Sequence, residues 1–203
     1  MAAAAAAQSA ASANAAPSLL LRSKVLVIGD AGVGKSAIVQ MFHSKGTHYP
    51  KSYVMTTGCD FVMKELKVPD TTTTVELHIY DCSGQTTFTE LTHQYWGGVN
   101  LVMLVYDATN EESFEHLSGW LEALRRKMPE RQIPGVVVAN KIDRGERVRV
   151  HTGKATEFAR DNGLDYFQVS ALTNSNIEEP FLHLSSIFNR MYEEKLNLIQ
   201  DMM

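Results

Sequence analysis

Apolar residues along the chain gather in short runs that predict buried strands. Residues 24–28, 101–106 and 135–139 are almost uninterrupted apolar stretches. A strand covered by helices on both faces carries apolar side chains at nearly every position, so these runs predict parallel strands inside an α/β fold. Residues 166–169 form a weaker candidate of the same kind.

Two further segments alternate apolar and polar residues, which predicts strands with one solvated face. They cover residues 61–68 and 75–80 and are joined by Pro69, Asp70 and a run of threonines. Such a connection can form a turn but cannot pack into a core. The two segments therefore predict an antiparallel hairpin at one edge of the sheet.

Segments of helical periodicity separate most of these strands. Residues 36–42 follow a glycine-rich turn, and apolar residues recur at spacings of three and four over residues 114–124 and 177–191. Asn176 is a candidate cap for the last helix, and Pro180 is tolerated only in its first turn. Together the elements predict an α/β fold: a doubly wound, mostly parallel six-stranded sheet with one antiparallel edge strand. Ligands of such folds bind at the carboxyl ends of the strands.

Composition and charge narrow the class of protein. The chain has 203 residues, which suits one compact domain, and its 19 Lys and Arg against 23 Asp and Glu give a net charge of −4. This balance argues against a nucleic-acid binder, which needs a basic face to offset phosphate charge. Its 2 cysteines are too few for a disulfide framework or a Cys-rich zinc site. No apolar run approaches the roughly 20 residues that span a bilayer, so we expect a soluble, cytoplasmic protein.

The two ends of the chain differ from its middle. No charged residue precedes Arg22, and residues 2–16 are nearly all Ala with scattered Ser, Asn and Gln. We expect residues 1–21 to be a disordered tail, with an organelle transit peptide as the alternative, and residues 22–192 to form the folded domain. Residues 193–203 carry more apolar side chains than one domain face needs. They predict a helical extension that either meets a partner or frays.

A phosphate-binding loop directly follows the first predicted strand. Residues 29–36 read Gly-Asp-Ala-Gly-Val-Gly-Lys-Ser and fit the P-loop pattern at every required position. The glycines let successive backbone amides point at one anion, and the following helix adds its positive end. Lys35 then reaches the outer phosphates, and the Ser36 hydroxyl binds Mg²⁺. The predicted phosphate contacts of this loop are Ala31, Gly32, Val33, Gly34, Lys35, Ser36 and Ala37.

A second motif indicates which base the nucleotide carries. Residues 140–143 read Asn-Lys-Ile-Asp and directly follow an apolar strand. A carboxylate at Asp143 accepts both the ring N–H and the exocyclic amine of guanine, a donor pair that adenine does not present on that edge. Asn140 is expected to brace the loops, and the aliphatic stem of Lys141 to lie along the base. The motif therefore favours guanine, and an ATPase or nucleotide kinase is poorly supported.

These motifs resemble the Ras superfamily of small GTPases over essentially all of residues 24–192. Within it the chain is most similar to the Rab branch, which has its own related segments at the positions of residues 56–61, 76–81, 95–98 and 104–107. More narrowly, residues 52–58, 75–77 and 110–114 resemble the Rab-like GTPases of intraflagellar transport. The resemblance implies the P-loop small G-protein fold, GTP and GDP as ligands, Mg²⁺ as cofactor and slow GTP hydrolysis.

Carried over position by position, the resemblance implies further roles around the phosphates. Thr56 would bind Mg²⁺ and the γ-phosphate in the GTP state, and Asp81 would hold Mg²⁺ through water. The Gly84 amide would touch the γ-phosphate. Gln85 matches the catalytic glutamine that orients the attacking water.

The resemblance also implies contacts with the base. Ser170 and Ala171 would steady it, with the Ala171 amide donating to the guanine carbonyl. Leu172 stands where the family has a lysine whose stem covers the guanine plane, so weaker nucleotide affinity is expected. Two residues, Tyr49 and His48, compete for the role of the aromatic residue that shields the base.

Three further departures from the family pattern bear on function. Ala31 replaces a glycine of Ras proteins, and one extra methyl group can obstruct an arginine supplied by a partner beside the γ-phosphate. Cys82 and Ser83 replace the usual Thr-Ala before Gly84. The chain ends Ile-Gln-Asp-Met-Met without the prenylated cysteines of Rab proteins, so no direct lipid anchor is expected.

Partners and location follow from the resemblance alone. It implies a tight pair with a small β-sandwich subunit, contacts with other proteins of the intraflagellar transport B complex, and a place in the cilium or flagellum and at the basal body. A GTP-hydrolysing switch is the first hypothesis. A nucleotide-loaded structural subunit with negligible turnover, or a Rab-like vesicle-traffic switch recruited by a protein partner, is the alternative.

Overall fold

A single sheet organises the part of the chain that the computed structural model describes, residues 19–203. Its strands are β1 (Leu20–Ile28), β2 (Cys59–Lys67), β3 (Thr74–Cys82), β4 (Leu101–Asp107), β5 (Gly135–Asn140) and β6 (Asp165–Gln168). They lie in the order β2-β3-β1-β4-β5-β6. β2 and β3 pair antiparallel, and all other neighbours pair parallel. The predicted mostly parallel six-stranded sheet with one antiparallel edge strand is confirmed.

Burial along the strands explains why the apolar pattern found them. Every residue of β4 and β5 is buried, because helices cover both faces of the sheet at its centre. β2 lies at the edge of the sheet and fully buries only Leu66. The position of each strand in the sheet therefore decides whether its sequence is a continuous apolar run or a mixed one.

β1 begins at Leu20, before the start at residue 24 that the apolar run predicts. The predicted domain boundary at residue 22 therefore falls inside a strand. Residues 20–23 alternate exposed and buried, because β1 pairs with β3 from Leu20 onward but meets β4 only from Val25. A strand end without its second neighbour shows no continuous apolar run. The rest of the predicted tail, residues 1–18, lies outside the described residues.

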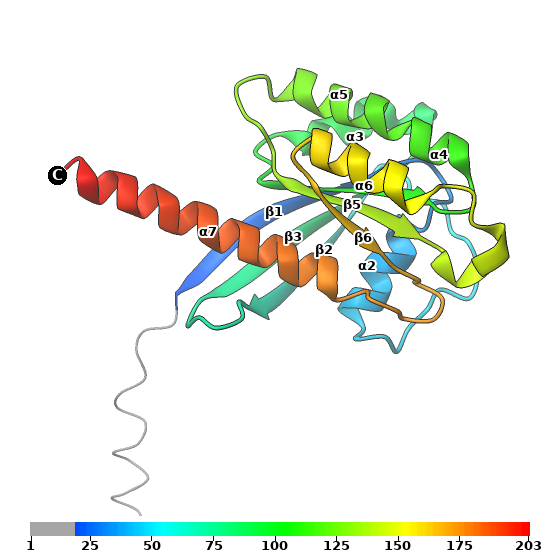
Figure 1. The fold of residues 1–203 in the computed structure, drawn as a ribbon, viewed down its shortest axis with the longest axis horizontal. Coiled ribbons are helices and arrows are strands. Elements are labelled where there is room, and N and C mark those ends of the chain that lie inside the picture. Colours follow the sequence, from blue (N-terminus) through cyan, green and yellow to red (C-terminus); the bar gives the residue numbers. More distant parts are fainter. Residues whose placement is uncertain (1–18) are drawn as a thin grey trace, which may run out of the picture.

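Helices cover the sheet on both faces (Figure 1). α2 and α7 pack on one face, and α4, α5 and α6 pack on the other. The α-helices of residues 19–203 are α2 (Lys35–His43), α3 (Thr89–His93), α4 (Glu111–Glu115), α5 (Leu117–Lys127), α6 (Thr152–Asp161) and α7 (Glu179–Asp201). The apolar stripes of the sequence predict α2, α5 and α7, whereas they do not reveal α3 and α6.

Two helix boundaries differ from those expected. The stripe over residues 114–124 belongs to two helices that meet at His116, which ends α4 and starts α5. The last helix begins at Glu179 with Pro180 in its first turn, as expected, but its cap position is Glu178. Asn176 is not the cap, because it adopts a left-handed φ of 56° and its side chain donates to the Gln168 carbonyl.

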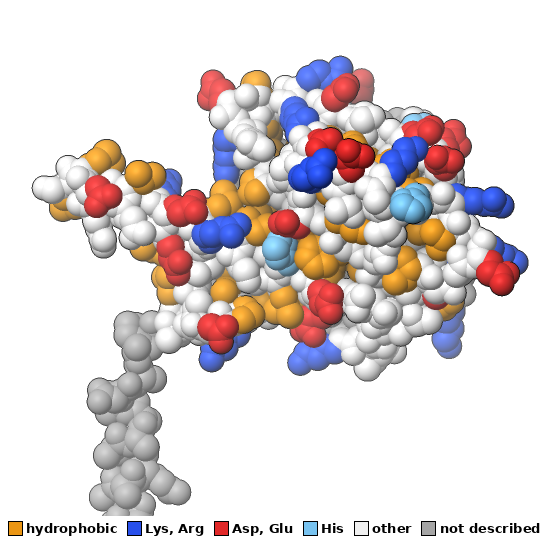
Figure 2. All heavy atoms as spheres, in the orientation of Figure 1, with side chains coloured by type: hydrophobic (Ala, Val, Ile, Leu, Met, Phe, Trp, Pro, Cys, Tyr) orange, Lys and Arg blue, Asp and Glu red, His pale blue; other side chains and the backbone are white. Residues whose placement is uncertain are grey.

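The far half of α7 extends beyond the sheet (Figure 1). Residues 193–201 continue the same helix, and hydrophobic side chains are visible along its projecting end (Figure 2). Leu198 and Ile199 are 63% and 42% exposed there. Among residues 19–203, no helix combines the length and apolar character needed to cross a membrane.

The near half of α7 is fixed by one aromatic stack. The rings of Phe181 and Phe42 lie parallel with centroids 3.8 Å apart and an interplanar angle of 9°, which joins α7 to α2. Phe181 is fully buried and Phe42 nearly so. The two helices that cover this face of the sheet thereby pack as one layer.

Replacing the buried ring tests this packing. Phe181→Ala should lower the free energy of unfolding by about 3–5 kcal/mol, because it loses buried surface and leaves a cavity against Phe42. Chemical denaturation of the full chain measures the loss. Leu198→Ala on the same helix is the matched control, and it should change the value by no more than about 0.5 kcal/mol. Similar losses in both variants would contradict the assignment of Phe181 to the core.

Candidate functional site

The loop after β1 has the sharp backbone that an anion cradle requires. Gly32 and Gly34 have φ values of 77° and 99°, and α2 begins directly afterwards at Lys35. Gly29 needs glycine for a different reason, because an added Cβ there would lie 2.1 Å from the Val105 carbonyl oxygen. The sequence therefore needs glycine at these turns, and the result is a helix N-terminus whose amides face the loop.

Lys35 lies at the centre of the loop and is 6% exposed. Its Nζ donates to the carbonyl oxygens of Gly29 and Asp30 at 2.8 and 2.7 Å. Burial lowers the pKa of Lys35 to about 8, against the opposing effect of Asp81. A buried ammonium group with only carbonyl partners favours the arrival of an anion.

Ser36, Thr56 and Asp81 supply oxygen atoms beside this loop. The hydroxyls of Ser36 and Thr56 lie 3.1 Å apart, although 20 residues separate them in sequence. Asp81 is 2% exposed, and burial raises its pKa to about 6. Its Oδ1 has no hydrogen-bond partner within residues 19–203.

This oxygen set fits a small, hard divalent cation. A buried carboxylate oxygen without a partner is costly unless a cation or a donor compensates it. Mg²⁺ prefers oxygen ligands and is commonly bound by one or two carboxylates together with substrate phosphates. In residues 19–203 no three His, Cys, Asp or Glu side chains gather into a metal site of their own. The residues present therefore fit a cation that arrives with phosphate oxygens.

Asn140 ties the phosphate loop to the loop after β6. Its Nδ2 donates to the Val33 carbonyl at 2.9 Å, and its Oδ1 accepts from the Ala171 amide at 3.1 Å. The side chain is 2% exposed, so both bonds are made away from water. This is the bracing that the sequence predicted for Asn140.

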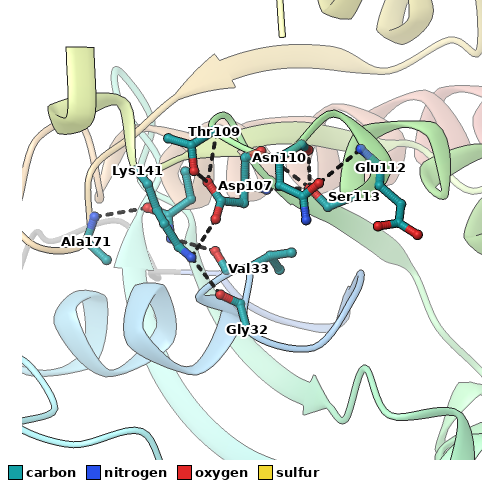
Figure 3. Close-up of polar contacts among 10 residues, drawn as sticks. Gly32, Val33, Asp107, Thr109, Asn110, Glu112, Ser113, Lys141 and Ala171 are labelled. Carbon is teal, nitrogen blue, oxygen red and sulfur yellow. Dashed lines mark hydrogen bonds and ion pairs between the residues drawn. The ribbon is translucent and has the colours of Figure 1, made fainter. Parts of the chain in front are cut away.

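Lys141 makes a second connection to the same loop (Figure 3). Its Nζ donates to the Gly32 carbonyl at 2.7 Å and to the Asp107 carboxylate at 2.6 Å. Burial acts to raise the pKa of Asp107, but hydrogen bonds from Lys141 and Thr109 outweigh it and hold the pKa below its usual value. No motif of the sequence marks Asp107 as a site residue. Its only signal is a carboxylate at the end of a buried strand.

Asp143 lies beyond Lys141 and is oriented by the last loop. The Ser170 hydroxyl donates to its Oδ1 at 2.5 Å. Ser170 is fully buried, whereas Leu172 is 57% exposed at the mouth of the site. The second carboxylate oxygen of Asp143 has no partner among the hydrogen bonds of the described residues and stays available to a ligand.

These groups surround one cavity of about 560 Å³. Most residues predicted to bind nucleotide line it, whereas Val33, Asp81 and Ser170 are not among the lining residues. Tyr49 and His48 both line the cavity, and both remain candidates for the aromatic residue that shields the base. The predicted lining residues are Ala31, Gly32, Gly34, Lys35, Ser36, Ala37, Thr56, Gly84, Gln85, Asn140, Lys141, Asp143, Ala171 and Leu172.

Gly84 brings the segment after β3 against the phosphate loop. A Cβ at this position would lie 2.3–2.4 Å from the backbone of Gly29, Asp30 and Ala31. Gln85 follows directly and borders the cavity. Glycine at residue 84 thus permits the closest approach of this segment to the place where an outer phosphate would lie.

A comparison with protein families agrees with this geometry. The model of the Ras family matches residues 24–190, which include every residue of the cavity lining. The chain belongs to the Ras family.

Individual relatives of this Ras-family chain place it more narrowly. The "Intraflagellar transport protein 27 homolog" of Bos taurus is 42% identical over 180 residues, which cover 89% of this chain and 97% of that protein. The "Intraflagellar transport protein 27" of Chlamydomonas reinhardtii is 42% identical over 185 residues, covering 89% and 91%. "Ras-related protein Rab-15" of Bos taurus is 31% identical over 173 residues, covering 85% and 79%. The resemblance to Rab-type GTPases, and to those of intraflagellar transport in particular, is confirmed.

The phosphate loop of this Ras-family protein is also held from the side of α5. Asp30 accepts from the Trp120 indole N–H at 2.8 Å, and its other oxygen pairs with His116 Nδ1 at 2.7 Å. The sequence does not predict this contact, because the partners lie 86 and 90 residues from Asp30. The only sequence signal is the spacing of four between His116 and Trp120, which places them on one helix face.

The Asp30–His116 pair should make the loop sensitive to pH. The hydrogen bond and the charge of Asp30 raise the pKa of His116 above its ordinary 6.5. The pair therefore stabilises the fold fully below pH 6.5 and loses this effect as the pH rises through the raised pKa. Because the His116 side chain is 53% exposed, screening by water keeps the effect small.

An NMR titration of the histidines checks this pair. In Asp30→Asn the pKa of His116 should fall toward 6.5, because the carboxylate charge is lost while the side-chain volume stays nearly the same. His183, which pairs with Asp165 elsewhere, is the control, and its NMR signals should match those of the unsubstituted chain. An unchanged His116 titration would show that the ion pair does not form.

Proposed function

We propose that this protein binds GTP and GDP with Mg²⁺ in the cavity at the carboxyl ends of the strands and hydrolyses GTP slowly. The observation that carries the proposal is the joining of the phosphate loop and Asp143 around one cavity through Asn140. A single ligand that carries phosphates at one end and a guanine base at the other fits both the phosphate-loop side and the Asp143 side of the cavity. Membership of the Ras family supports the same ligand.

At the base end, Asp143 would decide the specificity. Ser170 occupies one of its oxygens, which fixes the carboxylate plane without neutralising its charge. A guanine edge supplies two N–H donors to such a carboxylate, whereas adenine does not present this donor pair on that edge. Ala171, which lines the cavity, and the Lys141 stem would complete the base site, with Leu172 at its rim.

At the phosphate end, the chain's own groups would hold and orient the ligand. The loop amides and Lys35 would bind the outer phosphates, and Ser36, Thr56 and Asp81 would hold Mg²⁺, which when bound offsets charge on the β- and γ-phosphates. Gln85 would orient the attacking water. The Gly84 amide would meet the γ-phosphate, so the segment after β3 would respond to its loss.

Guanine selectivity tests the proposed ligand. Asp143→Asn should weaken GDP binding by at least about a hundredfold, because the amide places a donor against the guanine N–H groups. Titration with GDP and Mg²⁺ measures the affinity, and ATP should bind far more weakly than GTP to the unsubstituted chain. Asp70→Asn, in the exposed turn between β2 and β3, is the matched control. Unchanged GDP affinity in Asp143→Asn would overturn the base assignment.

We further propose that the protein acts as a subunit of the intraflagellar transport machinery. The names of the relatives from Bos taurus and Chlamydomonas reinhardtii support this role. The proposed partners are a small β-sandwich subunit and other proteins of the intraflagellar transport B complex. They would bring the protein from the cytoplasm to the cilium or flagellum and its basal body.

Two alternatives rest on specific observations. A nucleotide-loaded structural subunit is favoured by Ala31, by the exposed Leu172 and by the apolar projecting end of α7. A Rab-like vesicle-traffic switch recruited by a protein partner is favoured by the similarity to Rab-15. The three candidates share the nucleotide site and differ in turnover and in what the γ-phosphate controls.

Turnover separates the switch from the structural subunit. The full chain should hydrolyse Mg²⁺-GTP in a single turnover at about 10⁻⁴ to 10⁻³ s⁻¹, and Gln85→Leu should slow this at least about tenfold because the attacking water loses its orienting group. Thr86→Val, at the exposed neighbouring position, is the control. The same rate in Gln85→Leu and the unsubstituted chain would remove Gln85 from the mechanism.

A measurement of partner affinity in the two nucleotide states completes this experiment. A switch must bind its β-sandwich partner or effector with different affinities in the GDP and GTP-analogue states, since equal affinities cannot shift a conformational equilibrium. Unequal affinities together with Gln85-dependent turnover support the switch. Equal affinities without measurable turnover identify the structural subunit instead.

A further inference from the structure

The two cysteines of the chain face each other across the β2–β3 hairpin. Cys59 is the first residue of β2 and Cys82 the last residue of β3, and the strand register places them directly opposite. Their sulfur atoms lie 3.7 Å apart, with the Cys82 thiol donating to the Cys59 sulfur. Both are free thiols. Because the whole sequence contains 2 cysteines, each has the other as its sole intrachain candidate for a disulfide.

The hydrogen bonds of the ladder show which kind of pair this is. The Ser83 amide donates to the Gly58 carbonyl at 2.8 Å, so Gly58 and Ser83 form a hydrogen-bonded pair. Such pairs alternate with non-hydrogen-bonded ones along an antiparallel ladder, so the next pair, Cys59 and Cys82, is non-hydrogen-bonded. In these pairs the Cα atoms approach to about 4.5 Å, inside the range that a disulfide spans.

The pair lies where two segments of the nucleotide site leave the sheet. Three residues before Cys59, the Thr56 hydroxyl bonds to Ser36 of α2. Two residues after Cys82, Gly84 touches the backbone of the phosphate loop. The cysteine pair therefore joins the base of the Thr56 segment to the base of the Gly84 segment.

We propose that Cys59 and Cys82 form a reversible intrachain disulfide that fastens these two segments together beside the nucleotide cavity. A small disulfide such as glutathione disulfide serves as the oxidant. The Cys59 thiolate attacks one of its sulfurs and releases one glutathione thiolate. Cys82 then attacks the Cys59 sulfur and releases the second thiolate, which takes up the Cys82 proton. The two protein thiols are oxidised, one disulfide is reduced to two thiols, and no atom is left over.

The surroundings of the two thiols set the order and the pace of these steps. Cys82 is fully buried, whereas Cys59 is partly exposed, so the external disulfide meets Cys59 first. The hydrogen bond with Cys82 and then burial raise the pKa of the Cys59 thiol, which makes the first step slow at neutral pH. The second step joins sulfurs that already touch and is therefore fast.

Intact mass after equilibration in glutathione buffers tests the modification. The full chain, incubated at pH 8 with increasing ratios of glutathione disulfide to glutathione and then treated with an alkylating agent, should become a monomer that has lost two hydrogen atoms and takes up no alkyl groups. Cys59→Ser and Cys82→Ala are the controls and should stop at a free thiol or a mixed disulfide. A chain that stays reduced, forms only a mixed disulfide, or dimerises through intermolecular disulfides would overturn the proposal.

The effect of the disulfide is measured on the same samples. The oxidised chain should melt on the order of 5 °C higher than the reduced chain, because the cross-link restricts the unfolded state. It should also release a fluorescent GDP analogue at least about threefold more slowly, since release requires the two segments to loosen. Unchanged release in a fully oxidised chain would overturn the fastening role.

The release measurement rests on the proposed nucleotide site, but the mass measurement does not. If the reduced chain fails to bind the GDP analogue, the proposed function fails while the disulfide is still judged by its mass. If the reduced chain binds GDP but no intrachain disulfide forms, the inference fails while the proposed function stands.

Discussion

The buried side chain of Asn140 holds the nucleotide site together. Its amide bonds to the phosphate loop at Val33 and to the last loop at Ala171, so three segments that are remote in sequence share one side chain. The space it needs explains a neighbouring residue, because a Cβ at Gly34 would lie 2.2 Å from Asn140 Nδ2. Both bonds are shielded from water, so a substitution that removes one partner leaves the other polar group buried and unpaired. The phosphate end and the base end are therefore not independent.

The electrostatics of the cavity favour a ligand that brings both anion and cation. Burial lowers the pKa of Lys35 to about 8 and raises that of Asp81 to about 6, so each charge is disfavoured by the same loss of water. A polyphosphate would stabilise the lysine charge, and a cation bound to it would stabilise the carboxylate. Any ligand that binds only the folded chain stabilises it by mass action, so occupancy and folding of this region are linked.

The sequence predicts the sheet well because each strand's place in the sheet determines its composition. β4 and β5 are buried on both faces and are apolar throughout, whereas residues 20–23 of β1 lack a β4 neighbour and escape detection. Local motifs likewise locate the phosphate loop and the guanine motif, since their chemistry depends on consecutive residues. The Asp30 contacts with His116 and Trp120, and the Lys141 contact with Asp107, join segments far apart in sequence. No local pattern encodes these pairings, because only the packed sheet brings the partners together.

The direction of α7 has a consequence for how the molecule fits into an assembly. Its 23 residues span about 34 Å at 1.5 Å per residue, and its near end is anchored through Phe181. The far end projects on the side where β1 begins, away from the carboxyl ends of the parallel strands that carry the cavity (Figure 1). A protein bound to that far end would lie far from the cavity. The helix thus holds a neighbour bound to its tip away from the mouth of the cavity.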